Sequence, residues 1–186
     1  MNAGGHGSSV AESLLDVSVW SLDESEPRTI AAKDLALRYR ASNLRDCDVV
    51  LSATFALTVC GAESAEAVLS EIVRWRREHQ PGGANCGSVF TNPVGDSAGR
   101  LIDSAGLRGY RIGSASVSEK HANFIQADDN AVAADIWTLI IEIRRRVFET
   151  FGVELRPEVR TAGFDAVLPS LSSTSPGGSD LISDAP

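Results

Sequence analysis

The sequence lacks the features that mark membrane-spanning, secreted and nucleic-acid-binding proteins. No apolar run approaches the roughly 20 residues of a membrane span, and residues 1–9 have neither the basic nor the apolar segment of a signal peptide. Its 186 residues carry 17 lysines and arginines against 25 acidic residues, a net charge of −8, so the basic field that nucleic acid requires is missing. We therefore expect a cytoplasmic protein that uses neither a membrane nor nucleic acid as a partner.

Cysteine and histidine are also scarce. The cysteines are Cys47, Cys60 and Cys86, and they form no CxxC pair. The three histidines are scattered, so no metal-binding template is present. A reducing compartment and the absence of a metal site are the simplest expectations.

What remains is an ordinary globular composition, with 43% apolar and 23% charged residues. Apolar periodicity and turn residues predict helices at 64–79, 96–106 and 131–151, the last two with Asp96 and Asn130 as N-caps. Gly152 is predicted to end the third helix. Strands are predicted at 15–22, 49–59, 110–118 and 121–127, and weaker ones at 153–155 and 158–164. Because strands and helices do not alternate, the fold class is α+β.

The chain divides into three predicted parts. Residues 1–60 hold strands and little helix, residues 64–164 hold most of the periodic segments, and residues 165–186 are a Ser-, Pro- and Gly-rich tail that we expect to be disordered. The loop at 82–96 is rich in glycine and unusually long, which is typical of a functional loop.

Six segments in order resemble one enzyme family. They are MNAGGHG (1–7), YRAS (39–42), GSVFTNP (87–93), GDSAGRLIDSAGLRG (95–109), VSEKHANFI (117–125) and RPEVR (156–160). Over about residues 1–164 the chain is similar to UDP-N-acetylenolpyruvoylglucosamine reductases, also called UDP-N-acetylmuramate dehydrogenases. The resemblance implies a carboxy-terminal portion that lacks most of the amino-terminal FAD-binding region. It further implies that 1–60 is the later part of a PCMH-type FAD-binding domain and that 64–164 is a small α+β substrate-binding domain.

The resemblance also implies a reaction. Family members use NADPH and FAD to reduce UDP-N-acetylglucosamine enolpyruvate to UDP-N-acetylmuramate, a step of peptidoglycan precursor synthesis. Matching motifs imply three catalytic residues: Ser88 as the proton donor, Arg40 as the group that holds the substrate carboxylate, and Glu158 as the group that stabilises the enolic form.

Further residues are implied by position within the same motifs. For substrate binding these are Tyr39, Asn92, Lys120 and His121, and for contact with the flavin they are Asn2, Gly4, Gly5 and Gly7. Three consecutive arginines, Arg144, Arg145 and Arg146, lie near the end of the longest predicted helix, where they suit the negative end of its dipole, and we interpret them as structural.

Other interpretations stay open. Without the resemblance, Ser88 is a turn residue, Arg40 a surface arginine and Glu158 a solvated strand edge. Residues 95–99 fit the G-x-S-x-G pattern of serine hydrolases, although TNPV before them is a poor strand. The second class is a truncated, flavin-free sugar-nucleotide-binding module or an inactive fragment, with complementation by a separate amino-terminal segment as a further possibility.

Overall fold

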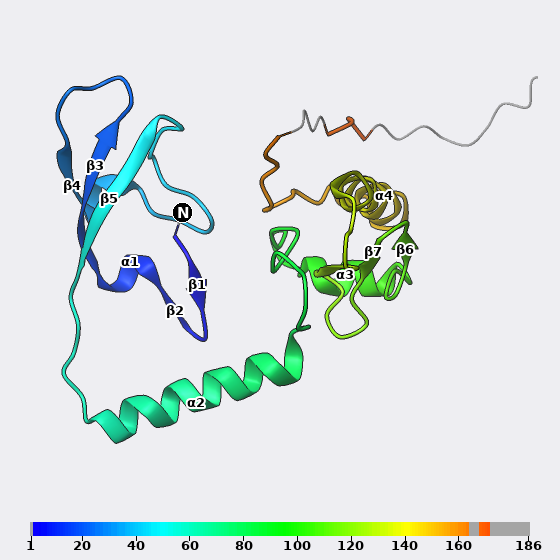
Figure 1. The fold of residues 1–186 in the computed structure, drawn as a ribbon, viewed down its shortest axis with the longest axis horizontal. Helices are drawn as coiled ribbons and strands as arrows, with labels where there is room; N and C mark the ends of the chain where they lie inside the picture. Colours follow the sequence, from blue (N-terminus) through cyan, green and yellow to red (C-terminus); the bar gives the residue numbers. More distant parts are fainter. Residues whose placement is uncertain (1, 164–167, 172–186) are drawn as a thin grey trace, which may run out of the picture. The chain divides into compact units, whose positions relative to one another are not determined.

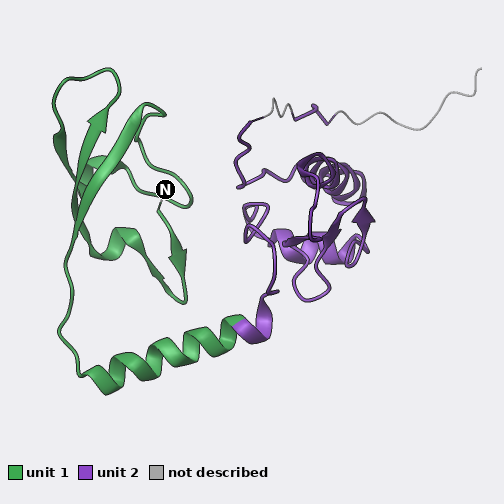
Figure 2. Cartoon of the chain, viewed as in Figure 1, with its two compact units in different colours: residues 1–76 green, residues 77–186 purple. Residues whose placement is uncertain are grey.

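The computed structural model describes residues 2–163 and 168–171, and it divides into two compact units, residues 1–76 and 77–186 (Figure 2). The boundary falls within a helix, after the predicted junction at 60–64. The division at 60 and 64 therefore stays a prediction. Most of the predicted tail, 165–186, lies outside the described residues.

Unit 1 is built on a three-stranded antiparallel sheet with the order β4-β3-β5 (Figure 1). Its strands are β3 (Leu14–Ser21), β4 (Arg28–Ala31) and β5 (Asp48–Phe55). Alternation along β3 turns Leu14, Val17 and Val19 inward against Leu35 of the 3-10 helix η1 (Ala32–Leu35). The strands predicted at 15–22 and 49–59 are confirmed, although β5 ends four residues early.

The first residues of unit 1 form a small hairpin. Strands β1 (Gly4–Gly5) and β2 (Ser8–Ser9) flank a turn in which His6 and Gly7 have φ of 52° and 81°, and helix α1 (Val10–Ser13) follows. After the sheet comes α2 (Ala62–His79), which confirms the predicted helix. None of its described residues is buried, and several of its apolar side chains are exposed: Val68, Leu69, Val73 and Trp75.

Unit 2 packs two helices against a second antiparallel sheet. The helices are α3 (Ala98–Ser104) and α4 (Ala133–Phe151), and the sheet has the order β6 (Arg111–Ile112), β7 (Ala115–Val117), β8 (Ile125–Ala127). The core is formed by apolar residues of all three layers, among them Leu101, Val117, Leu139 and Ile143. Helix α4 ends at Gly152, whose φ of 68° suits glycine, as predicted.

Several local predictions were wrong. Residues 110–118 form a hairpin rather than one strand, because Gly113 turns the chain with φ of 52°. In 121–127 only the last three residues form a strand, since Phe124 N–H bonds to His121 C=O in a turn (3.0 Å). Residues 153–155 and 158–163 form no strand, whereas Pro157 between them forms a bridge with Phe90; residue 164 lies outside the described residues.

The helix caps also differ from the prediction. Ser97, not Asp96, caps α3, because Asp96 instead accepts the Ser97 N–H (2.7 Å) and pairs with Arg100. Val132, not Asn130, precedes α4, and its side chain provides no cap.

The α+β class is confirmed by the mixed helices and separate sheets. Within residues 2–163 and 168–171, no helix combines the length and the apolar character needed to cross a bilayer. The same stretch contains no group of three or more His, Cys, Asp or Glu side chains that could hold a metal ion.

Candidate functional site

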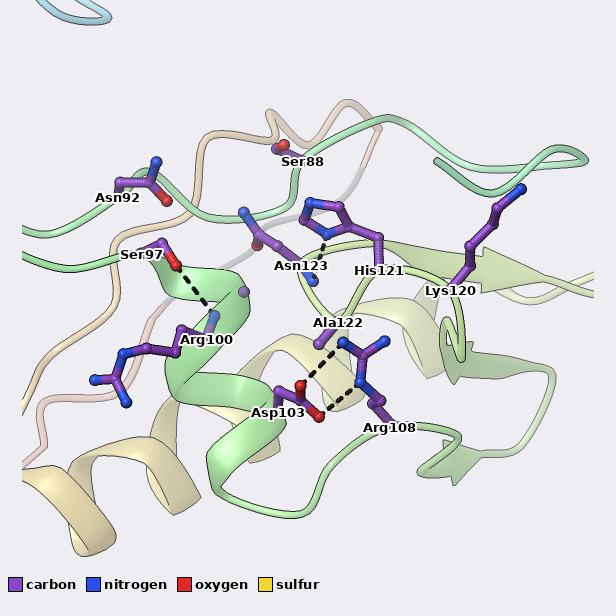
Figure 3. Close-up of a pocket in the computed structure, with 11 residues that line it drawn as sticks. Ser88, Asn92, Ser97, Arg100, Asp103, Arg108, Lys120, His121, Ala122 and Asn123 are labelled. Atoms are coloured by element: carbon purple, nitrogen blue, oxygen red, sulfur yellow. Dashed lines mark hydrogen bonds and ion pairs between the residues drawn. The ribbon is translucent and has the colours of Figure 1, made fainter. Parts of the chain in front are cut away.

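A cavity of about 410 Å³ in unit 2 brings together four of the predicted residues (Figure 3). Ser88, Asn92, Lys120 and His121 all line it. They come from two segments about 30 residues apart, the long glycine-rich loop and the turn before β8. Residues that the sequence analysis did not select complete the wall: Ser97, Gly99, Arg100, Asp103, Arg108, Ala122 and Asn123.

Ser88 is held by strand-like pairing with the segment before β8. It forms an antiparallel bridge with Phe124, and the Val89 N–H donates to the Asn123 carbonyl (2.9 Å). The buried Asn123 amide also binds the backbone of Phe90 on both sides, accepting its N–H (2.9 Å) and donating to its carbonyl (2.8 Å). The Ser88 backbone is therefore fixed by neighbours on the adjacent segment.

The His121 ring lines this pocket and accepts a backbone hydrogen bond. Its Nδ1 accepts the Asn123 backbone N–H (3.2 Å), so the neutral ring carries its proton on Nε2. Burial, with a smaller contribution from the Arg108 charge, lowers the His121 pKa below its usual value. In Figure 3 the ring lies beside the Asn123 side chain, below Ser88 in this view.

Gly99 allows helix α3 to approach this ring closely. A Cβ at Gly99 would lie 3.3 Å from His121 Cε1 and 3.7 Å from Asn123 Cβ. A side chain here would require the His121 ring to shift by a few tenths of an ångström. The close approach explains why small residues occur at the start of α3.

The charged groups of the pocket are largely paired. Arg108 binds both carboxylate oxygens of Asp103 (2.6 and 2.9 Å) and donates to the Glu119 carbonyl (2.7 Å). This bidentate hydrogen bonding lowers the Asp103 pKa. Lys120 Nζ donates to the Arg77 carbonyl, near the end of α2. The wall thus offers fixed cations whose charge is partly balanced.

Asn92 and Ser97 both serve the start of α3. Asn92 Oδ1 accepts the Ala98 N–H (3.0 Å), and Ser97 Oγ accepts the Arg100 N–H (3.2 Å). No strand precedes Ser97, because residues 91–97 contain none. The hydrolase elbow requires such a strand, so the geometry favours the capping role for this serine.

Glu158 lies on the segment paired with that of Ser88. Its N–H donates to the Val89 carbonyl (2.7 Å), and the Phe90–Pro157 bridge fixes the register. Its half-buried side chain is not among those that line the cavity. The structure therefore brings the Ser88 and Glu158 backbones together.

Arg40 and Tyr39 occupy the tip of a tight turn in unit 1. The turn is closed by two backbone hydrogen bonds between Arg38 and Ala41 (3.2 and 3.0 Å). Arg40 adopts φ of 52°, a left-handed conformation that is strained for a side chain of this size. Its guanidinium carbon lies 5.2 Å from the centre of the Tyr39 ring. The predicted approach of Arg40 to Ser88, in the other unit, stays a prediction.

The predicted flavin-contacting residues lie together in unit 1. Gly4 and Gly5 line a second cavity of about 460 Å³, together with Ile72 and Arg76 of α2. Asn2 forms a parallel bridge with Tyr39, and its Oδ1 accepts the Ala11 N–H (2.9 Å). Asn2 therefore stabilises the hairpin itself.

The two arginines of the pocket show what the sequence analysis missed. Arg100 and Arg108 lie in the segment GDSAGRLIDSAGLRG, which was selected as a whole. Their i,i+4 and i,i+5 spacing from Asp96 and Asp103 is a signal of ion pairs, which the structure contains. That spacing gives no sign that they face a cavity.

Comparison with known proteins places this pocket in a described domain. Residues 79–162 match the family model for the UDP-N-acetylenolpyruvoylglucosamine reductase C-terminal domain. The reductase of that name from Gloeobacter violaceus is 44% identical over 168 residues, which cover 88% of this chain and 56% of that protein. The corresponding protein from Oceanobacillus iheyensis is 40% identical over 169 residues, covering 90% and 55%.

A solved structure is also similar. The crystal structure of UDP-N-acetylenolpyruvylglucosamine reductase from Thermus caldophilus aligns with a TM-score of 0.71 at 35% identity. The alignment covers 83% of this chain and 56% of that one. The chain thus spans about half the length of the relatives it matches.

Proposed function

The chain belongs to the UDP-N-acetylenolpyruvoylglucosamine reductase family, and from that premise we propose that it supplies the substrate pocket and the proton donor of such a reductase. The substrate would be UDP-N-acetylglucosamine enolpyruvate and the product UDP-N-acetylmuramate. The observation that carries the proposal is the cavity of unit 2, whose wall combines Ser88, Asn92, Lys120 and His121.

The glycine segment of unit 1 is compatible with part of a flavin. A Cβ built at Gly5 or Gly7 would meet nothing within 4 Å, so the backbone there is open to a flat ring. Gly4, Gly5 and Gly7, with Asn2, would hold this part of FAD. When bound, FAD would take a hydride from NADPH and deliver it to the β-carbon of the enolpyruvyl group.

The residues of the chain would complete the reduction by supplying a proton. Hydride addition leaves a negative charge at the α-carbon, delocalised into the carboxylate. Ser88 Oγ–H would protonate the α-carbon, and Arg40 would hold the carboxylate with its planar fork. Glu158 would stabilise the enolic form, either as a protonated acid or by accepting a hydrogen bond. Neutral His121 would donate Nε2–H to the substrate and, unlike Arg40, would bring no positive charge.

The proton donor and its neighbours would act by preorganisation. A serine hydroxyl is a weak acid, and it can react here because the carbanion is strongly basic and the backbone of Ser88 is fixed by bonded neighbours. Removing one such preorganised donor typically lowers the rate by about 10²–10³-fold. Cytoplasmic location and a role in cell-wall synthesis follow from the same proposal.

A second candidate is a flavin-free sugar-nucleotide-binding module. Unit 2 has its own core and its own pocket, so it could bind the nucleotide sugar by itself. In that case unit 1 would have no redox role in the isolated chain.

One experiment separates the two functions. The purified chain is titrated with FAD and with UDP-N-acetylglucosamine enolpyruvate, and NADPH consumption is then followed, with and without the amino-terminal segment of a relative. We expect the chain alone to bind substrate, to hold little flavin and to turn over poorly. Gain of NADPH oxidation with the added segment supports the reductase. Substrate binding without any NADPH oxidation under either condition supports the binding module.

A further inference from the structure

Two buried polar side chains, Asn123 and Arg144, form hydrogen bonds to the backbone close to Ser88 and to Glu158. We call each of these sets of hydrogen bonds a grip. Asn123 is 4% exposed and Arg144 is 3% exposed. The Asn123 side chain makes two hydrogen bonds to the Phe90 backbone, and Arg144 makes one to the Leu155 carbonyl, just before the segment that contains Glu158. Neither was selected as a functional residue by the sequence analysis.

Arg144 interrupts the apolar stripe of α4. It follows Ile143 and precedes Val147, both of which are buried in the core of unit 2. Its Nε donates to the Leu155 carbonyl (2.9 Å), its Nη2 to Glu154 Oε1 (2.6 Å) and its Nη1 to the Pro169 carbonyl (3.3 Å). Arg144 therefore fixes the chain at Leu155, immediately before Arg156, where pairing with the Ser88 segment begins.

A buried guanidinium is a costly way to obtain stability alone. Replacing buried ion pairs by apolar groups of similar volume is often neutral or stabilising. The Glu154 side chain is 55% exposed, so its attraction to Arg144 is weakened by solvent. What an apolar side chain could not provide is the directional bond to the Leu155 carbonyl.

Asn123 holds the opposite segment. Its amide forms two hydrogen bonds with the Phe90 backbone (2.9 and 2.8 Å), and its own carbonyl accepts the Val89 N–H (2.9 Å). Between the two grips, the segments are joined by Thr91 N–H to the Arg156 carbonyl (3.0 Å) and by Glu158 N–H to the Val89 carbonyl (2.7 Å). The result is a continuous chain of contacts from α4 to β8.

We propose that Asn123 and Arg144 are positioning residues that set the placement of Ser88 relative to Glu158. The inference rests on the proposed function, because it concerns the two groups assigned to the reaction. Small displacements of a reacting group lower rates steeply, by about 10²-fold for roughly 1 Å. Loss of either grip should therefore affect kcat more than KM.

The test compares neighbouring arginines on the same helix. Arg144→Met removes the grip, while Arg145→Met removes an arginine that is 47% exposed and pairs with Glu142 and Glu149. In the chain complemented for activity, kcat should fall by about 10- to 100-fold in Arg144→Met with KM little changed. Arg145→Met should match the wild type, and Arg144→Lys should recover part of the loss.

A double-mutant cycle shows whether Arg144 acts through Glu158. If it does, Arg144→Met should have little further effect on kcat in a Glu158→Gln background. Asn123→Asp, which keeps the oxygen that accepts the Phe90 N–H, should likewise be non-additive with Ser88→Ala. Additive effects in both cycles, or an equal loss in Arg145→Met, would overturn the proposal.

A second measurement needs no activity. Hydrogen exchange at the Glu158 and Thr91 amides, both of which bond across the paired segments, should be about tenfold faster in Arg144→Met than in Arg145→Met. If the reductase activity is absent but this exchange difference is present, the proposed function fails and the grip stands. Equal exchange in the two variants overturns the grip whatever the activity.

Discussion

The two units differ in how completely they bury their apolar residues. The core of unit 2 draws on both helices and the sheet, with Leu101, Val117 and Leu139 fully enclosed. The core cluster of unit 1 contains Leu14, Val17, Val19 and Leu35. Much of the apolar surface of β5 and α2 is exposed, for example Leu51 and Leu69.

This difference bears on where each unit can hold a group rigidly. Side chains enclosed in a packed core occupy well-defined positions. Polar groups on backbone that is bonded to such a core are therefore also held in well-defined positions. Unit 2 anchors Ser88, His121 and Glu158 in this way, whereas Arg40 of unit 1 sits at the tip of a turn. The proton donor that we propose, Ser88, thus lies in the better-packed unit.

The largest expected effect tests that assignment. In Ser88→Ala, kcat for the proposed NADPH-dependent reduction should fall by about 10²–10³-fold, because the hydroxyl proposed to protonate the α-carbon is gone. Ser116→Ala on β7, which does not line the cavity, is the matched control and should keep its rate. Full activity in Ser88→Ala would remove the chemical role from unit 2.

A pair of core substitutions tests the packing difference itself. Leu139→Ala in unit 2 should lower the free energy of unfolding by about 2–5 kcal/mol, because it empties a fully buried site. Leu69→Ala on α2, at a side chain 61% exposed, should change it by less than about 0.5 kcal/mol. Chemical denaturation followed by circular dichroism measures both. A loss at Leu69 as large as at Leu139 would mean that the α2 face is covered.

For the strained turn of unit 1 we predict a smaller effect, an increase rather than a decrease in the free energy of unfolding. Arg40→Gly should raise the free energy of unfolding by about 1 kcal/mol, because glycine adopts φ of 52° without strain. It should lose turnover at the same time, since the guanidinium is absent. Arg38→Gly, in the same turn, should not stabilise the protein. Stabilisation of both variants would show that relief of strain at Arg40 is not the cause, because glycine flexibility by itself lowers stability.

The smallest expected effect concerns pH. Hydrogen bonds from Arg145, with a further one from Arg146, lower the Glu142 pKa from 4.5 to about 2. Since the folded pKa is depressed, the stabilisation is present above pH 4.5 and is lost as pH falls toward 2. Glu142→Gln should therefore lower the urea midpoint at pH 7 and leave it nearly unchanged at pH 2. Glu71→Gln on α2 of unit 1 is the control, and an equal pH dependence there would exclude a specific role for the α4 ion pairs.

Local patterns predicted the elements well where periodicity was strong. The stripe of Ile136, Ile140, Ile143 and Val147 gave α4, and Gly152 gave its end. They failed where one residue decides the path of the chain. The turn at Gly113 splits a strand pattern into a hairpin, and Asp96 is drawn into an ion pair and leaves the cap to Ser97.

The site was predicted only in part, because motif matching selects residues but not their supports. Ser88, Asn92, Lys120 and His121 were selected from separate segments, and the fold gathers them around one cavity. Arg144 was interpreted as a helix-end arginine, although its side chain is buried and binds the Leu155 carbonyl. The signal in the sequence that could have indicated its burial is its position within the apolar stripe of α4.

Local patterns in the amino-acid sequence were sufficient to predict the α+β class, the main helices and the family of the chain. Those properties rest on periodicity, on glycine positions and on short motifs, all of which are local along the chain. The pairing of the Ser88 and Glu158 segments became visible only in the folded chain. The same is true of the hydrogen bonds from Asn123 to Phe90 and from Arg144 to Leu155. Asn123 and Phe90 are 33 positions apart, and Arg144 and Leu155 are 11 apart. Such contacts are set by how the core packs.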